Sequence, residues 1–261
     1  MNRINLEMNE VVRLLQEYQN IQFKKILHYE KYNHYEITHH STNIEGSTLT
    51  ETETQLLLDE GLTPKGKPLT HSLMTKDHYE ALLYIIQEAK QKREVTVEFI
   101  QSINAKVLKN TGAIYNTLFG EIDSSKGAFR KANVRAGSRY FVNYAKVPEY
   151  TAQFTDELAK KMNTQQTIQD QLLLSFDAHL ELVSIHPFYD GNGRTSRLLM
   201  NYLQAYYNLP LAIVFTEDKA DYFDTLEQTR KEENRQFFYD FMLQQYTKHL
   251  QTEIQRYREI L

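Results

Sequence analysis

Twelve consecutive residues of this chain, 186–197, combine residue types that handle phosphate groups and metal ions. An imidazole at His186 and a carboxylate at Asp190 precede an asparagine flanked by two glycines, and two arginines follow. Packing does not require these types together, whereas a site for a phosphorylated nucleotide and a metal ion does. This segment is therefore the candidate functional site.

The glycines and arginines of the segment predict a phosphate cradle. Gly191 and Gly193 permit positive φ angles, so that successive N–H groups can point inward as an anion-binding nest. A helix that begins within the segment adds unpaired N–H groups and the positive end of its dipole. Arg194 and Arg197 share one helical face, so both can donate to phosphate oxygens. Asp190 suits Mg²⁺, which usually binds one or two carboxylates together with substrate phosphates.

The elements around the segment are predicted to be mainly helical. Apolar residues from Leu172 to Val183 share one face of a helix, so His186 follows the end of a buried helix that Pro187 interrupts. Apolar periodicity and capping signals predict helices over 4–37 (as one or two), 50–60, 71–92, 97–110, 148–162, 169–184, 198–206, 218–229 and 235–259.

One short β-hairpin is predicted over about 133–144, where two extended runs flank Gly137-Ser138-Arg139. The loop over 61–70 is rich in glycine, proline and lysine and marks a boundary. It divides an N-terminal helical region, 1–60, from a second domain, 61–261, that contains the 186–197 segment and the hairpin. The fold class expected is therefore mainly α with one small hairpin.

The composition excludes several classes of protein and site. The net charge of −4 disfavours a dedicated nucleic-acid binder, and no cysteine is available for disulfides or for zinc. No run of residues resembles a signal peptide or a membrane span, so we expect a cytoplasmic protein without a membrane partner. His34, His39 and His40 have poor spacing for a metal, and His179 is expected to pack between helices.

The segment 186–197 matches the signature of the Fic family, HPFx[D/E]GNGRxxR, at every constrained position. The resemblance implies a Fic-like helical bundle with a β-hairpin flap, and transfer of AMP from ATP to a Tyr, Thr or Ser hydroxyl of a target protein. It implies that His186 is the general base and that Asp190 holds Mg²⁺. It also implies that Asn192, with the backbone of Gly191 and Gly193, binds the phosphates, and that the two arginines hold the β- and γ-phosphates.

A second motif lies far upstream. Residues 41–46 resemble [S/T]xxxE[G/N], which self-inhibited members of the family carry N-terminal to the signature. The resemblance implies that Glu45 pairs with Arg197 and withdraws it from the γ-phosphate, at a cost of about 1.5–3 kcal/mol to the competent state. The alternative is that Thr42 and Glu45, which have capping-box spacing, cap a helix.

Two further segments resemble parts of the family. The hairpin 133–144 occupies the place of the target-docking flap, although it could equally be a plain surface hairpin. Residues 220–226 resemble the segment that covers adenine, where Tyr222 or Phe223 could stack on the base; the alternative is a core-facing aromatic pair. Arg230 stands where relatives often place an asparagine, so the adenine contacts are not inferred from the family.

The sequence thus predicts a self-inhibited protein adenylyltransferase that uses Mg²⁺ and ATP. Its partner would be a protein with an exposed hydroxyl side chain, the chain itself included, and the apolar N-terminal helices could serve a homodimer. Two alternatives stay open: removal of AMP, with Glu45 aligning a water molecule at the same site, and a nucleotide-binding regulatory module in which transfer is vestigial.

Overall fold

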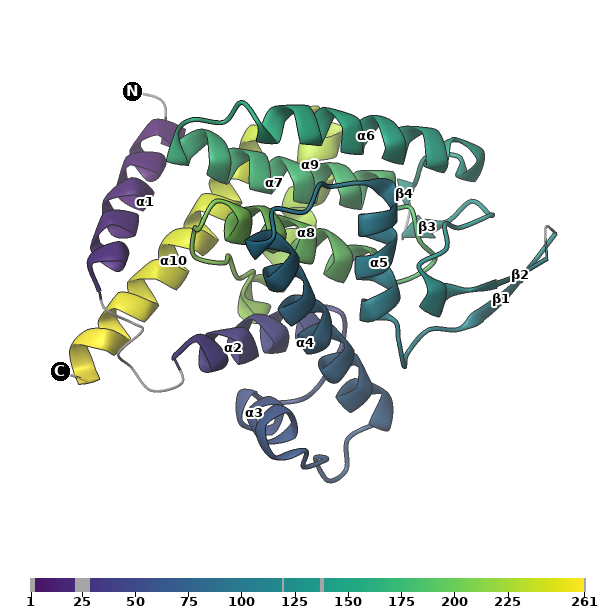
Figure 1. The fold of residues 1–261 in the computed structure, drawn as a ribbon, viewed down its shortest axis with the longest axis horizontal. Coiled ribbons are helices and arrows are strands. Elements are labelled where there is room, and N and C mark those ends of the chain that lie inside the picture. The colour runs from purple at the N-terminus through teal and green to yellow at the C-terminus, as the bar shows by residue number, and fades with distance from the viewer. Residues whose placement is uncertain (1–2, 22–28, 119, 137–138, 261) are drawn as a thin grey trace.

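A computed structural model describes residues 3–21, 29–118, 120–136 and 139–260, and most of them are helical (Figure 1). The α-helices within these ranges are Arg3–Asn20 (α1), Tyr29–Ile44 (α2), Glu51–Glu60 (α3), Leu69–Lys90 (α4), Val97–Val107 (α5), Val147–Met162 (α6), Ile168–Ile185 (α7), Asn192–Tyr206 (α8), Lys219–Lys231 (α9) and Gln236–Ile260 (α10). Four short strands are Ile114–Thr117 (β1), Gly120–Asp123 (β2), Arg135–Ala136 (β3) and Arg139–Tyr140 (β4). The expected mainly α fold is confirmed.

Helices α7 and α8 form the centre of the bundle. They pack against each other, α6 covers α7, and α4 and α5 contact α8 (Figure 1). Their shared core is shielded from solvent, with Phe99, Leu198 and Tyr202 wholly buried. Burying side chains of this size stabilises the fold by about 1.5–3 kcal/mol each. The two ends of the 186–197 segment therefore lie on the most firmly packed helices.

The N-terminal helices pack on different parts of this bundle. Helix α1 packs on α10, and α2 packs on α4 and also contacts α8. The helical region was predicted to end at residue 37, but α2 continues to Ile44. The hydroxyl of Thr42 donates to the carbonyls of Thr38 and His39, so this polar stretch satisfies itself inside the helix.

Helix α3 begins and ends where the sequence predicts. Thr50 and Glu53 make a reciprocal capping box, and Gly61 ends the helix in a left-handed conformation. The loop over 61–68 then leads to α4, as expected. Helices from both sides of this loop, α2 and α4, pack against each other, and the domain boundary placed here stays a prediction.

Two hairpins project from the side of the molecule opposite α1 and the end of α10 (Figure 1). The predicted hairpin is present as β3 and β4, with its turn residues 137–138 outside the described residues. The antiparallel pair β1–β2 was not predicted. Its strands are mostly exposed, so they lack the alternation that marks a half-buried strand. No described helix is long and apolar enough to cross a membrane.

Candidate active site

The backbone fixes His186 at the end of α7. Its φ of 53° places it in the left-handed region, and its N–H donates to the Leu182 carbonyl at 3.0 Å. A non-glycine residue adopts this conformation only where its surroundings hold it there, at a cost of about 1–3 kcal/mol. The position expected for His186, directly after a buried helix, is therefore present, and it is strained.

The imidazole of His186 is covered by the flap. Phe141, next to β4, stacks on it with ring centroids 3.7 Å apart and an interplanar angle of 18°. Burial, together with the nearby positive charges of Arg139 and Arg130, lowers the pKa of His186 to about 4. The imidazole is therefore neutral at pH 7 and able to accept a proton.

Arg130 is a residue of this site that the motif did not reveal. It is 1% exposed, and its guanidinium donates to the carbonyls of His186, Ala132 and Val142. These three carbonyls belong to the 186–197 segment and to the two sides of the hairpin β3–β4. The buried guanidinium of Arg130 therefore connects the hairpin to the backbone of His186 through hydrogen bonds. Only its place in Gly127-Ala128-Phe129-Arg130, ahead of the hairpin, hinted at it.

The two glycines of the cradle differ in their geometry. Gly191 has a φ of +76° and caps α8, as expected. Gly193 lies within α8 and has no positive φ, so that expectation is wrong: this glycine supplies space. A Cβ atom there would lie 2.3 Å from Oε1 of Glu45 and 3.2 Å from Nη1 of Arg197. Because Gly191 offers no side-chain cap, the N–H groups of the first turn of α8 remain for a ligand.

Asparagine side chains hold this turn in place. Asn192 accepts from the N–H of Phe188 at 3.0 Å and donates to its carbonyl at 2.9 Å. Asn104 on α5 donates to the Asp190 carbonyl and to the Thr195 hydroxyl. The Asn192 side chain is therefore engaged by the protein, and a phosphate can meet this residue through its backbone N–H.

Asp190 lies at the open edge of the turn. Its carboxylate accepts from the Gly191 N–H at 2.6 Å and from Arg194 at 3.3 Å, while the side chain stays 53% exposed. A half-exposed carboxylate beside a phosphate cradle fits the way in which Mg²⁺ is bound, with water and substrate phosphates completing the shell. No described group of three or more His, Asp or Glu side chains could hold a metal by itself.

Both arginines of the segment are buried and have N–H donors without a hydrogen-bond partner. Arg194 and Arg197 are 2% and 3% exposed. The Nε and Nη1 atoms of Arg194 and the Nη1 atom of Arg197 are buried without a hydrogen-bond partner. A buried, unpaired charged donor is costly, so such groups are explained best by an anion that binds there.

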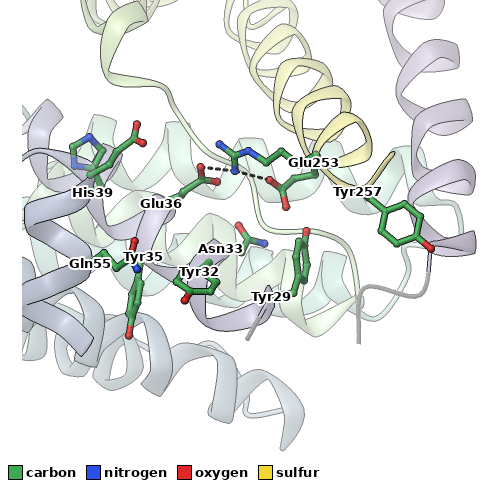
Figure 2. Close-up of a pocket in the computed structure, with 11 residues that line it drawn as sticks. Tyr29, Tyr32, Asn33, Tyr35, Glu36, His39, Gln55, Glu253 and Tyr257 are labelled. Atoms are coloured by element: carbon green, nitrogen blue, oxygen red, sulfur yellow. Dashed lines mark hydrogen bonds and ion pairs between the residues drawn. The ribbon is translucent and has the colours of Figure 1, made fainter. Parts of the chain in front are cut away.

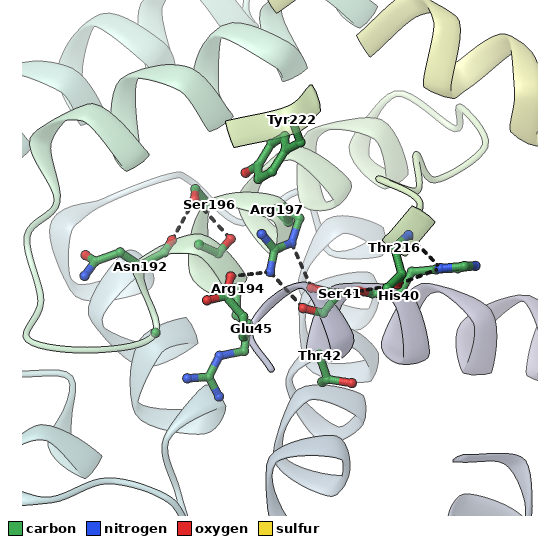
Figure 3. Close-up of polar contacts among 12 residues, drawn as sticks. His40, Ser41, Thr42, Glu45, Asn192, Arg194, Ser196, Arg197, Thr216 and Tyr222 are labelled. Atoms are coloured by element: carbon green, nitrogen blue, oxygen red, sulfur yellow. Dashed lines mark hydrogen bonds and ion pairs between the residues drawn. The ribbon is translucent and has the colours of Figure 1, made fainter. Parts of the chain in front are cut away.

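Arg197 is already held by the end of α2 (Figure 3). Its Nη2 atom lies 2.7 Å from Oε1 of Glu45 and 2.9 Å from the Ser41 carbonyl, and its Nε atom donates to the Ser41 hydroxyl at 2.9 Å. The pairing of Glu45 with Arg197 that the sequence predicted is present. Ser41 as a second partner was missed, although the four-residue spacing to Glu45 places both on one helical face.

The environment of Glu45 favours its charged form. Burial acts to raise the pKa of Glu45, but Arg197 and Arg194 outweigh it and hold the pKa below its usual value. Conversely, burial acts to lower the pKa of Arg197, and Glu45 reverses that effect. The alternative that Glu45 caps a helix with Thr42 is wrong, because Thr42 lies inside α2 and bonds backward along it.

The two aromatic candidates for the base differ in exposure. Tyr222 is buried in the core beneath Arg197, where its hydroxyl bonds to Nε2 of His179 at 2.8 Å. Phe223 is 46% exposed on the next position of α9. Tyr222 therefore follows the core interpretation, and only Phe223 is free to meet a base. His179 packs between helices as expected, and Arg230 lies exposed near Glu227.

The comparisons with known proteins agree with this geometry. A model of the Fic/DOC family matches residues 94–204, which include the whole signature. The structure superposes on a Fic-domain-containing signalling protein of Bacteroides thetaiotaomicron with a TM-score of 0.83, covering 97% of each chain at 23% identity.

The chain therefore contains a Fic/DOC domain.

Curated relatives of this Fic chain are longer proteins. It is 28% identical over 222 residues to the protein adenylyltransferase fic-1 of Caenorhabditis briggsae, covering 84% of this chain and 40% of that protein. It is 30% identical over 200 residues to the protein adenylyltransferase Fic of Drosophila willistoni, covering 76% and 37%. The chain thus spans about 40% of the length of these relatives.

Proposed function

We propose that this Fic chain transfers AMP from ATP to a hydroxyl side chain of a target protein. One observation carries the proposal: Arg194 and Arg197 have buried, unpartnered guanidinium donors and lie on α8, whose uncapped start belongs to the segment that begins with His186. This arrangement suits a triphosphate whose α-phosphate meets the imidazole. The names of the curated relatives support it.

The proposed step follows from the groups present. The neutral imidazole of His186 accepts the proton of the target hydroxyl, whose oxygen forms a bond to the α-phosphorus. The bond between the α-phosphorus and the bridging oxygen breaks, and pyrophosphate leaves. Mg²⁺, held by Asp190, would neutralise charge between the phosphates. The first-turn N–H groups of α8 and Arg194 orient the chain of phosphates, so positioning supplies most of the catalysis.

Glu45 would restrain this step by occupying Arg197. While Arg197 bonds to Glu45 and Ser41, it is withdrawn from the γ-phosphate, and ATP would bind in an unproductive pose. The flap β3–β4, which Arg130 fixes above His186, is the proposed docking edge for the target segment. The same proposal includes modification of the chain itself as one target, assembly as a homodimer and a cytoplasmic location.

Removal of AMP is a second candidate because of where Glu45 lies. Its Oε1 atom is so close to Gly193 that no Cβ atom would fit between them, which places a carboxylate at the proposed position of the phosphates. A carboxylate there could align a water molecule for hydrolysis. Wild-type protein would then release AMP from a pre-modified target, and Glu45→Gly would not.

The test of transfer compares wild type, Glu45→Gly and Glu45→Gly/His186→Ala with α-labelled ATP and cell lysate. We expect labelled protein bands with Glu45→Gly and none when His186 is also replaced. Calorimetric titration with ATP must show that the double variant still binds nucleotide. Labelling that persists without His186 would contradict the proposal, and nucleotide binding without any labelling would favour the vestigial regulatory module.

A further inference from the structure

A cavity separate from the phosphate cradle lies beside α2, toward the N-terminal end of that helix. It has a volume of about 260 Å³ and opens between α2, the beginning of α3 and the end of α10 (Figure 2). Glu36, in its wall, is nine residues before Glu45, which corresponds to about 13 Å along the helix. The cavity is therefore distinct from the phosphate cradle, although one helix connects the two.

Aromatic rings form much of the wall of this cavity, which we call the α2–α10 cavity. Four tyrosines line it: Tyr29, Tyr32, Tyr35 and Tyr257. Tyr35 is 4% exposed, and the ring of Tyr32 meets it edge-to-face, with centroids 6.1 Å apart. Tyr32 is 43% exposed, so a ligand can reach this ring from solvent. The electron-rich faces of such rings attract cations, with Tyr among the effective types.

The charges in the same wall leave negative charge in excess. Glu36, Glu51 and Glu253 line the cavity, and Arg256 is the one basic side chain among its described lining residues. A single atom, Nη1 of Arg256, serves two of these carboxylates, at 2.6 Å from Glu36 and 3.0 Å from Glu253. Glu253 is 2% exposed and also interacts with the Tyr29 hydroxyl, so Arg256 is the only positive charge that the described lining residues offer to these carboxylates.

Neighbouring groups do not remove this excess. Burial raises the pKa of Glu36, and Arg256 opposes this change without reversing it. His39, also in the wall, adds none at pH 7, because burial lowers the pKa of its ring. A further cation inside the cavity would add a counter-charge for the carboxylates and could contact the exposed ring of Tyr32.

We propose that the α2–α10 cavity binds a small methylated ammonium ion, with its charge between Glu36 and Glu253 and its methyl groups against Tyr32 and Tyr29. A compact site of this size, with aromatic walls and a few charged groups, is suited to such a ligand. Nothing in this assignment depends on the chemistry of the phosphate cradle.

Binding at this site would also strengthen the inhibited state, and that consequence rests on the proposed function. Glu36 belongs to α2 and Glu253 to α10, so the ligand fits best when α2 lies where it lies here. The same position of α2 places Glu45 and Ser41 on Arg197. A ligand that prefers one conformation shifts the population toward it, and the coupling is reciprocal.

Calorimetric titration of the full chain tests the site. Choline is the probe, and 3,3-dimethyl-1-butanol, which has the same shape without the charge, is its control. We expect choline to bind at least about tenfold more tightly than the alcohol, a difference of about 1.4 kcal/mol. Tyr32→Leu and Glu51→Gln should each weaken choline at least about threefold, whereas Tyr150→Leu, a similarly exposed tyrosine on α6, should not. Equal binding of the two probes, or no binding of choline, would overturn the proposal.

The effect on activity is measured separately. Saturating choline should lower AMP transfer by wild type and leave Glu45→Gly unaffected. If choline binds but does not change transfer by wild type, the coupling between the two sites is wrong. If neither protein transfers AMP while choline binds as expected, the proposed function fails and the cavity assignment stands.

Discussion

Replacing Glu45 by glutamine should destabilise the nucleotide-free protein, although glutamine has nearly the same shape. The change removes the charge that compensates Arg197, whose side chain is 4% exposed, and keeps an oxygen that can accept its hydrogen bond. A charged hydrogen bond contributes about 1.5–3 kcal/mol and a neutral one about 0.5–1.5 kcal/mol. We therefore expect the free energy of unfolding to fall by about 1–2 kcal/mol. The loss should be no larger, because Ser41 still accepts hydrogen bonds from the guanidinium.

Calorimetry or thermal fluorescence measures this effect as a decrease in Tm of about 2–6 °C. The matched control is Glu227→Gln, which removes an exposed ion pair with Lys231 worth about 0–1 kcal/mol. Mg-ATP should raise the Tm of Glu45→Gln more than that of wild type, because phosphate supplies the missing negative charge. Equal Tm values for the two variants, or equal stabilisation of variant and wild type by Mg-ATP, would refute the reasoning.

The pH dependence of the same comparison has a defined sign. Arg197 and Arg194 hold the pKa of Glu45 below its value in the unfolded chain, in spite of its burial. The carboxylate therefore stabilises the fold fully above a pH of about 4.5, and this contribution is lost as the pH falls through the folded-state pKa. The difference in Tm between wild type and Glu45→Gln should accordingly be constant near neutrality and shrink in acid.

Three further predictions follow from contacts around the site. Gly193→Ala should lower Tm in wild type by several degrees but much less in Glu45→Gly, because the clash is with Glu45; equal losses in a double-mutant cycle would contradict this. Arg130→Lys should lower Tm and slow transfer, since lysine cannot serve three carbonyls, and an unchanged kcat would show that the flap is positioned otherwise. Burial lowers the pKa of His186 to about 4 and that of His179 to about 3, so below pH 6.5 the unfolded chain binds more protons than the folded chain. Each histidine should therefore lower the free energy of unfolding by about 2 kcal/mol at pH 5. A Tm that does not change between pH 7.5 and pH 5 would contradict their burial.

Much of the site was predictable because its parts are local in sequence. The signature places His186, Asp190 and the arginines within one turn and the helix that follows, so their neighbourhood needs no long-range folding information. The pairing of Glu45 with Arg197 spans 152 residues and was predicted from a motif and from charge. Its partner Ser41 lies on the same helical face and could have been found by the same argument.

Other features depend on contacts that no sequence pattern encodes. Gly193 could serve either a positive φ or a close approach, and only the position of Glu45 decides between them. Arg130 resembles any loop arginine until the flap and the end of α7 converge on it. The pair β1–β2 buries little beyond Ile122, so hydrophobic alternation could not reveal it. In each case the missing information is tertiary.

The most direct test of the central claim measures the initial rate of AMP transfer from α-labelled ATP by wild type and by Glu45→Gly, with self-labelling and a lysate as acceptors. Loss of one charged hydrogen bond of about 1.5–3 kcal/mol predicts a rate about 10- to 100-fold higher for the variant. The gain should disappear when His186→Ala is added. Equal rates for wild type and Glu45→Gly would contradict the claim that Glu45 restrains the site by holding Arg197.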